Sequence, residues 1–183
     1  MFAERTSPLT ALPVQARETG FSLIELMIVM ALLAALMTVG APGLNDLIQS
    51  NRMATQTNDV VSMLTYTRGE ALRRGARVSI CPSSDGASCS GSDWGIGLVV
   101  FADLNRDGSL GAGEEILRTL PALAGGATLS AGGGISNVIQ FRGTGVAMFS
   151  GTLTLCDSRP DQGRRIEIFQ TGRISTTRGV TCS

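Results

Sequence analysis

The feature that most constrains this chain is an apolar run from Phe21 to Val39, interrupted by a single acid, Glu25. Two hydroxyl residues are the only other polar side chains in the run. As an α-helix rising about 1.5 Å per residue, the run reaches roughly 28 Å, close to the hydrocarbon thickness of a bilayer. The sequence therefore predicts a membrane-spanning helix over residues 21–43, where a carboxylate is rare unless it has a role.

The residues before this helix do not form an ordinary secretory signal. Residues 1–20 are polar and contain two prolines, and no small-x-small cleavage site follows the apolar run. We therefore interpret residues 1–20 as a leader and residues 44–183 as a separate globular domain. Arg5 and Arg17 precede the helix, which favours a cytoplasmic N-terminus and a globular domain on the opposite side of the membrane.

The composition argues against catalysis. The chain contains no histidine, and all 15 of its basic residues are arginine. The absence of histidine and lysine excludes His-based acid–base catalysis, Ser-His and Cys-His nucleophiles, Schiff-base lysines and His-containing zinc sites. We therefore expect a protein that is not an enzyme and requires no cofactor.

Four cysteines predict disulfide bonds. An even number of cysteines in an exported chain favours disulfides, and four allow three connectivities. The spacings favour Cys81 with Cys89 and Cys156 with Cys182. The alternatives are buried free thiols or a four-thiolate metal site, although the chain contains no Cys-x-x-Cys spacing.

The junction between the leader and the helix reads Gly20-Phe21-Ser-Leu-Ile-Glu25-Leu. This stretch resembles the processing site of type IV pilins and type II secretion pseudopilins. The resemblance implies that a prepilin peptidase cleaves after Gly20, that Phe21 is then N-methylated, and that the helix is loosened at Pro42. Cleavage leaves a charged amine about one helical turn from Glu25, so the two charges can neutralise each other within a subunit or between neighbours.

The next stretch, from Leu44 to Arg74, spaces its apolar residues mostly by three, four or seven, which predicts an amphipathic helix ending near Gly75. Together with the sequences that follow, it is similar to the GspH/FimT family of minor pilins and pseudopilins. The residues that carry this similarity are Tyr66–Arg74, Val78–Cys81, Trp94–Gly97 and Val99–Asp103.

After Gly75, short apolar and β-branched runs alternate with glycine-rich turns, which predicts an antiparallel two-sheet module packed on the amphipathic helix. The fold class is therefore α+β, and the family resemblance implies the same pilin-like architecture with a long N-terminal helix. The expected strands are 77–81, 95–102, 115–120, 127–130, 137–142, 146–149, 152–156, 165–170 and 173–176.

One loop matches the EF-hand pattern. Asp103, Asn105 and Asp107 alternate, Gly108 occupies the turn position, and Glu114 is twelfth. These oxygen groups suggest a Ca²⁺ site. Strands rather than helices flank the loop, however, so the alternative is a glycine-rich connection in which Asp and Asn serve turn geometry.

The C-terminal part is rich in arginine, with six arginines and three acids in residues 142–183. Some GspH/FimT proteins act as DNA receptors through a Gly-Arg-x-Arg motif. This chain has Gly-Arg173-Ile-Ser, so serine replaces the second arginine. Arg164, Arg165 and Arg178 are nearby in sequence and suit phosphate contacts. The alternative is a solvated, turn-rich surface, because a few exposed arginines bind DNA only weakly.

The resemblance implies a minor pilin or pseudopilin. Such a protein is a single-pass inner-membrane protein with a periplasmic head, and it enters the tip or initiation complex of a type IV pilus or a type II secretion pseudopilus. Its expected partners are prepilin peptidase, the inner membrane, and other minor and major pilins or pseudopilins. The alternative function is a DNA-binding receptor for natural transformation.

Overall fold

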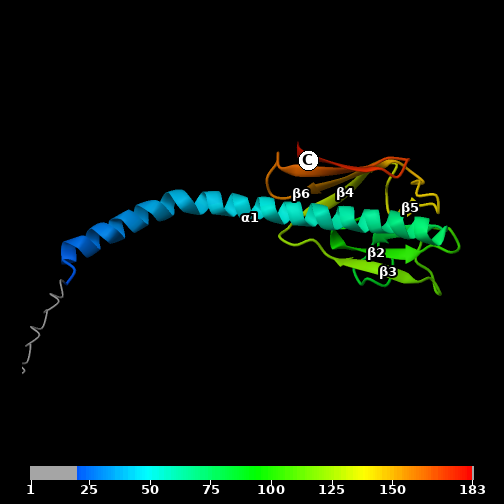
Figure 1. Cartoon of the computed structure of the whole chain (residues 1–183), viewed down its shortest axis with the longest axis horizontal. Helices are drawn as coiled ribbons and strands as arrows, with labels where there is room; N and C mark the ends of the chain where they lie inside the picture. The colour runs from blue at the N-terminus through cyan, green and yellow to red at the C-terminus, as the bar shows by residue number, and fades with distance from the viewer. Residues whose placement is uncertain (1–19, 183) are drawn as a thin grey trace, which may run out of the picture. The chain divides into compact units, whose positions relative to one another are not determined.

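The computed structural model describes residues 20–182 of the chain, with the side chains of residues 38–43 left aside (Figure 1). The chain divides into two compact units, Met1–Leu44 and Asn45–Ser183. We call the second unit the head. The predicted leader, residues 1–20, lies outside the described residues except for Gly20.

A single helical element, α1 (Leu23–Arg74), contributes to both units. The backbone is helical at residues 38–43, including Pro42. Because the side chains there are not described, the predicted loosening of the helix stays a prediction. Gly75 ends the helix in the left-handed conformation, with φ of 61°, and its N–H donates to the carbonyl of Leu72. This position confirms the predicted stop, because glycine adopts positive φ without steric strain.

Within the head, one face of α1 is buried, as the spacing of its apolar residues predicts. The buried residues at that face are Met53, Val60, Met63, Leu64 and Ala71. Not every apolar position follows the pattern. Four apolar residues of the predicted amphipathic stretch are exposed instead, namely Leu44, Leu47, Ile48 and Leu72.

Two four-stranded sheets complete the head, and every strand pairing in them is antiparallel. One sheet has the order β3-β2-β1-β5 and the other β4-β6-β7-β8. The predicted α+β architecture with two sheets is therefore confirmed. The strands are β1 (Val78–Pro82), β2 (Gly97–Ala102), β3 (Ile116–Pro121), β4 (Thr128–Gly133), β5 (Ile139–Phe141), β6 (Gly151–Cys156), β7 (Gly163–Ile168) and β8 (Ile174–Val180).

Two strand predictions need correction. Residues 146–149 form no strand, and only Ala147 makes an isolated bridge, to Phe141. The preceding Gly145 has φ of 76°, which turns the chain, and the next N–H groups donate to different partners, Gln170 and Gln140. The expected strand from residue 95 begins instead with the 3₁₀ helix η1 (Trp94–Ile96), because the Asp93 side chain accepts from the N–H of Gly95 and caps a helical turn.

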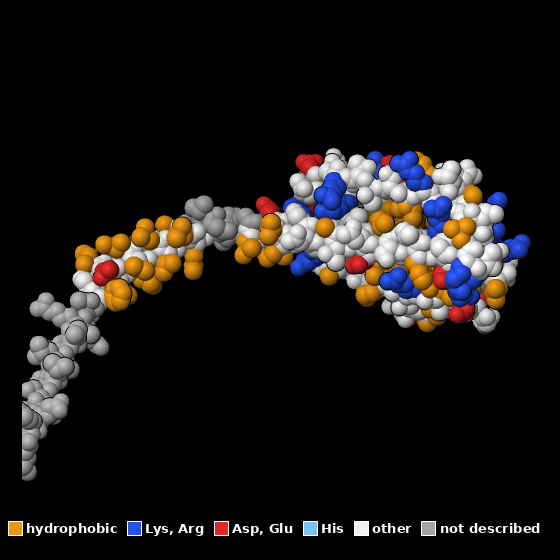
Figure 2. All heavy atoms as spheres, in the orientation of Figure 1, with side chains coloured by type: hydrophobic (Ala, Val, Ile, Leu, Met, Phe, Trp, Pro, Cys, Tyr) orange, Lys and Arg blue, Asp and Glu red, His pale blue; other side chains and the backbone are white. Residues whose placement is uncertain are grey.

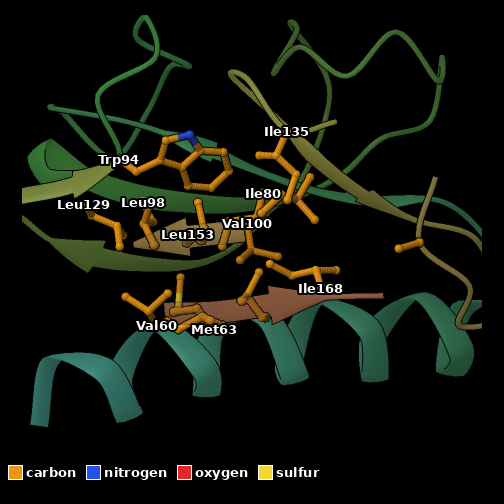
Figure 3. Close-up of a cluster of buried hydrophobic side chains, with 14 of the residues drawn as sticks. Val60, Met63, Ile80, Trp94, Leu98, Val100, Leu129, Ile135, Leu153 and Ile168 are labelled. Carbon is orange, nitrogen blue, oxygen red and sulfur yellow. The ribbon is translucent and has the colours of Figure 1, made fainter. Parts of the chain in front are cut away.

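The main core lies between α1 and the two sheets. Figure 3 shows Val60 and Met63 pointing from α1 toward residues of both sheets, with Trp94 on the side of the cluster away from the helix. Trp94 is 1% exposed, and its indole N–H donates to the carbonyl of Ser136 over 2.8 Å. Each large apolar side chain buried here contributes about 1.5–3 kcal/mol. The core therefore holds the helix and both sheets as one unit.

A smaller cluster covers the face of the sheet β3-β2-β1-β5 that is turned away from the main core. All six residues of β2 are buried, so this strand is covered on both faces. The second cluster consists of Cys81, Val99 and Phe101, with Cys89, Leu110 and Val138 packed against it. Leu110 belongs to the loop between β2 and β3, so this loop is packed onto the sheet.

Candidate functional site

The predicted processing site lies directly before α1. Gly20 and Phe21 belong to no helix or strand and are exposed, and no described atom lies within 4 Å of the Cβ that a side chain at Gly20 would carry. The first helical hydrogen bond runs from the N–H of Leu26 to the carbonyl of Ser22, over 3.2 Å. The bond between Gly20 and Phe21 therefore lies outside the helix.

Glu25 occupies the first turn of α1. An acid is favourable there, because the first backbone N–H groups of a helix carry a partial positive charge. Phe21 and Glu25 are four residues apart, which corresponds to about one turn and a rise of roughly 6 Å if the helix extends to Phe21. In such a helix, an amine on Phe21, as predicted after cleavage, would lie about one turn from the carboxylate of Glu25.

The large apolar side chains from Phe21 to Met37 are exposed among the described residues. Figure 2 shows hydrophobic groups around this part of α1 with one acidic group among them. Phe21 is 86% exposed and Met37 is 72% exposed. A continuous apolar surface of this kind marks a contact with lipid or protein. The large residues exposed between those two are Leu23, Ile24, Leu26, Met27, Ile28, Val29, Met30, Leu32, Leu33 and Leu36.

Across the part of the chain that the structure describes, no helix reaches the combined length and hydropathy expected of a membrane span. The predicted transmembrane role of residues 21–43 stays a prediction.

Both predicted disulfides are present. Cys81 bonds to Cys89 and Cys156 bonds to Cys182, with Cα atoms 5.6 and 5.8 Å apart. The second bond joins the end of β6 to the segment after β8, where the N–H of Cys182 also donates to the carbonyl of Pro160. The disulfides therefore fasten a loop to β1 and the C-terminal segment to β6.

Inside the first disulfide loop, Asp85 organises a tight turn. Its carboxylate accepts from the backbone N–H groups of Ala87 and Ser88 and from the hydroxyl groups of Ser83 and Ser88. These bonds, led by the one from Ala87, hold the pKa of Asp85 below its ordinary value. Asp85 therefore has a structural role in this loop.

The four predicted calcium ligands form hydrogen bonds with other groups of the head. Asn105 donates to Asp107 over 2.7 Å. Glu114 accepts instead from the backbone N–H groups of Leu104, Asn105 and Gly111. Among the described residues, no group of three His, Cys, Asp or Glu side chains lies close enough to hold a metal. The calcium site stays a prediction, and in the structure the loop is closed by its own hydrogen bonds.

Asp103 is directed into the head rather than outward. It is 1% exposed, and its Oδ2 atom accepts from the hydroxyl of Ser79 and the side-chain amide of Gln140, over 2.7 and 2.8 Å. Its Oδ1 atom is buried without a hydrogen-bond partner among the described residues. Asp103 thus connects β1 and β5 at the base of the loop, a role that its position in the EF-hand pattern does not reveal.

The arginines predicted to contact DNA lie at two places on the sheet β4-β6-β7-β8. Arg164 in β7 and Arg178 in β8 are partners in strand register. Arg173 precedes β8 and lies over the ring of Phe169, at 5.3 Å. Five residues of extended chain separate Arg173 from Arg178, about 16 Å. Arg165 follows Arg164 directly, so the two side chains point to opposite faces of the strand.

Arg164 is also tied to α1. Its Nη2 atom donates to the carbonyl of Ser50, over 3.3 Å. Burial first, and then the nearby charges of Arg178 and Arg159, lower the pKa of Arg164. The structure therefore brings Arg159, Arg164 and Arg178 together, whereas only the last two are among the predicted DNA residues.

Arg159 was not predicted by the sequence. It pairs with Asp157 at 2.5 Å and donates to the hydroxyl of Ser50 over 3.0 Å. These contacts hold the loop between β6 and β7 against α1. The sequence signal is only the spacing Asp-x-Arg, which does not indicate a partner on a helix more than 100 residues away.

Comparisons with known proteins agree with this architecture. The model of the family described as type II transport protein GspH matches residues 56–172, and the model of the prokaryotic N-terminal methylation motif matches residues 15–41. The chain is 25% identical to the type IV minor pilin FimU of Pseudomonas aeruginosa, with a TM-score of 0.58 over 72% of this chain and 92% of that one.

Two further solved structures share the fold. A second crystal form of FimU is 24% identical, with a TM-score of 0.53 over 69% of this chain and 93% of that one. The minor pseudopilin EpsH from the type 2 secretion system of Vibrio cholerae is 14% identical, with a TM-score of 0.50 over 69% of this chain and 97% of that one.

Proposed function

This chain belongs to the GspH family of type II transport proteins, and on that premise we propose that it is a minor pilin or pseudopilin subunit of the tip or initiation complex of a type IV pilus or a type II secretion pseudopilus. The match to the family model bears out the resemblance drawn from the sequence. The match to the methylation motif spans residues 15–41 and so includes Gly20, Phe21 and Glu25.

The observation that carries this proposal is the uncovered apolar surface of α1 with one acid in its first turn. Before assembly, lipid of the inner membrane covers that surface. During assembly, the surface is transferred to the interior of a filament, where other pilins or pseudopilins cover it. The free energy of the apolar contacts changes little in this transfer, because both surroundings are apolar.

Glu25 makes this transfer specific. Prepilin peptidase cleaves after Gly20 and exposes an amine on Phe21, which is then methylated. An unpaired carboxylate in apolar surroundings costs at least several kcal/mol, so Glu25 favours positions where a neighbouring amine neutralises it. The pairing therefore fixes the position of an arriving subunit relative to its neighbours.

The test follows the variants Glu25→Ala, Glu25→Gln and Glu25→Asp through processing and assembly. We expect all three to be cleaved and to fractionate with membranes. The first two lose the charge and should be depleted from sheared filaments, whereas Glu25→Asp should retain part of the incorporation. Mass spectrometry of the N-terminus checks cleavage and methylation. Incorporation of Glu25→Ala at the parent level would refute the charge-pairing account.

A second candidate function is a DNA-binding receptor for natural transformation. The pairing of Arg164 with Arg178 across neighbouring strands supports it, because two adjacent guanidinium groups suit contacts with a phosphate backbone. A gel shift with double-stranded DNA at low and moderate salt tests this function. Binding that is unchanged in Arg173→Ala and Arg178→Ala variants would exclude these residues as a DNA site.

A further inference from the structure

Three arginines meet at a pocket that the proposed function does not use. The pocket has a volume of about 320 Å³ and lies where the end of α1, the loop after β2 and the turn after β5 come together. Its volume is at the lower end of the range of small-molecule sites. It is lined by Gly75, Ala76, Arg77, Arg106, Arg142 and Gly143.

The three guanidinium groups have no acidic partner among the described residues. Arg77 donates to the backbone carbonyl of Arg106 over 2.9 Å, and the Nε atom of Arg142 faces the sulfur of Met148. None of the three forms an ion pair, and no acid lines the pocket. The pocket is therefore lined by three arginines and by no acid.

The acids nearest in sequence are already engaged. Glu70 is paired with Arg73 and Arg74, and Glu115 is paired with Arg74. In the loop that contains Arg106, Glu114 accepts from three backbone N–H groups, and Asp107 accepts from Asn105 and from the N–H of Ser109. None of these acids forms an ion pair with the three arginines of the pocket, and neither does the buried Asp103, whose Oδ2 atom accepts from Ser79 and Gln140.

The backbone around the pocket is closely packed. A Cβ atom at Gly143 would lie 2.3 Å from the carbonyl carbon of Gly75, so only glycine fits there. Arg106 has φ of 69° and is the sole non-glycine residue with positive φ in the described part of the chain. Side chains rarely adopt this conformation, and residues that do so occur often at ligand sites. Here the conformation presents the carbonyl of Arg106 to Arg77.

We propose that this pocket binds a phosphate group. Three arginines match a multiply charged oxyanion better than a carboxylate with a single charge, because each planar guanidinium donates two hydrogen bonds to a pair of oxygens. Gly75 and Gly143 line the pocket without side chains, which leaves room for a compact tetrahedral group. The phosphate group comes either from a free phosphate compound or from the backbone of a nucleic acid.

Binding is measured by calorimetry on the full chain in detergent, with inorganic phosphate titrated at constant ionic strength. The first variant is Arg106→Gly, which removes a guanidinium and relieves the positive φ, so its fold is retained. The second is Arg142→Gln. The matched control is Arg52→Gln, which removes an exposed arginine of α1 that does not line the pocket. We expect each pocket variant to weaken phosphate binding at least about tenfold and the control to leave it unchanged.

Competition identifies the source of the phosphate group. If double-stranded DNA displaces phosphate from the parent, and the Arg106→Gly variant binds that DNA more weakly than the parent does, a nucleic acid is the ligand. If phosphate remains bound in the presence of DNA, the ligand is a free phosphate compound. Both outcomes support the pocket. The proposal is refuted if the parent shows no saturable binding at a Kd of about 1 mM or tighter, or if the pocket variants bind as the control does.

Discussion

Replacement of the buried Asp103 tests whether this residue belongs to the core of the head or to a calcium site. Its Oδ2 atom accepts hydrogen bonds from Ser79 and Gln140, and the whole residue is 1% exposed. Asp103→Ala removes the acceptor and leaves two buried donors without a partner. Hydrogen bonds to charged groups contribute about 1.5–3 kcal/mol each, partly offset here because the unpartnered Oδ1 atom is no longer buried. We expect a net loss of about 3 kcal/mol.

The matched variant is Asp103→Asn. Its amide oxygen can still accept from Ser79 and Gln140, but neutral hydrogen bonds are about half as strong as charge-assisted ones. The free energy of unfolding should therefore fall by roughly half as much as in Asp103→Ala. For a chain of this size, a loss of about 3 kcal/mol lowers the melting midpoint by about 6–12 °C.

The assay is thermal unfolding of the full chain in detergent, followed by the fluorescence of Trp94, which is the only tryptophan and is buried in the core. Stability of Asp103→Ala within about 0.5 kcal/mol of the parent would refute the structural role. The same melts with added Ca²⁺ test the loop, because a bound ion stabilises by about 2.7 kcal/mol at 100 times its Kd. A calcium-dependent rise that is lost in Asp103→Asn would show that Asp103 is a ligand.

Two other predictions concern charge and covalent links. Hydrogen bonds from Arg73 and then Arg74 lower the pKa of Glu70 from 4.5 to about 2. Its contribution to stability is therefore present above about pH 4.5 and is lost as the pH falls through about 2, and Glu70→Gln should flatten the pH dependence of the midpoint in this window. In the chain-entropy model, replacing Cys156 and Cys182 by serine should lower the free energy of unfolding by about 3.5 kcal/mol. The same replacement of Cys81 and Cys89 should lower it by about 2.6 kcal/mol, because these two cysteines close a shorter loop. Denaturant midpoints of the two double variants check the order, and equal losses would contradict it.

The sequence predicted those parts of the fold that depend on residues close together along the chain. The spacing of apolar side chains between Leu44 and Arg74 follows the helical period, and Gly75 supplies the stop. The strands are short runs of β-branched residues between glycines, so most were found within a few residues of their ends. Residues 146–149 were misassigned because their composition suits a strand, while their backbone N–H groups find partners in different segments.

The candidate sites also differ in whether they depend on residues close together in the chain or on residues from distant segments. Gly20, Phe21 and Glu25 form a contiguous motif, and the match to the methylation motif covers them. The EF-hand pattern in the loop from Asp103 is contiguous too, but burial of its first residue depends on Ser79 and Gln140, which belong to other strands. A local sequence pattern therefore indicates which chemical groups a loop contains, but it does not predict the direction in which a side chain points.

The sequence by itself determined the apolar helix with its acid, the pairing of the cysteines and the two-sheet class, because each depends on local period or short spacing. Only the tertiary structure decided the order of the strands, the tie between Arg159 and α1, and the meeting of Arg77, Arg106 and Arg142 at one pocket. These arginines are 29 and 36 residues apart, and they meet because three loops end at the same place. Contacts of that kind follow from packing of the whole head, which no short segment of the chain specifies.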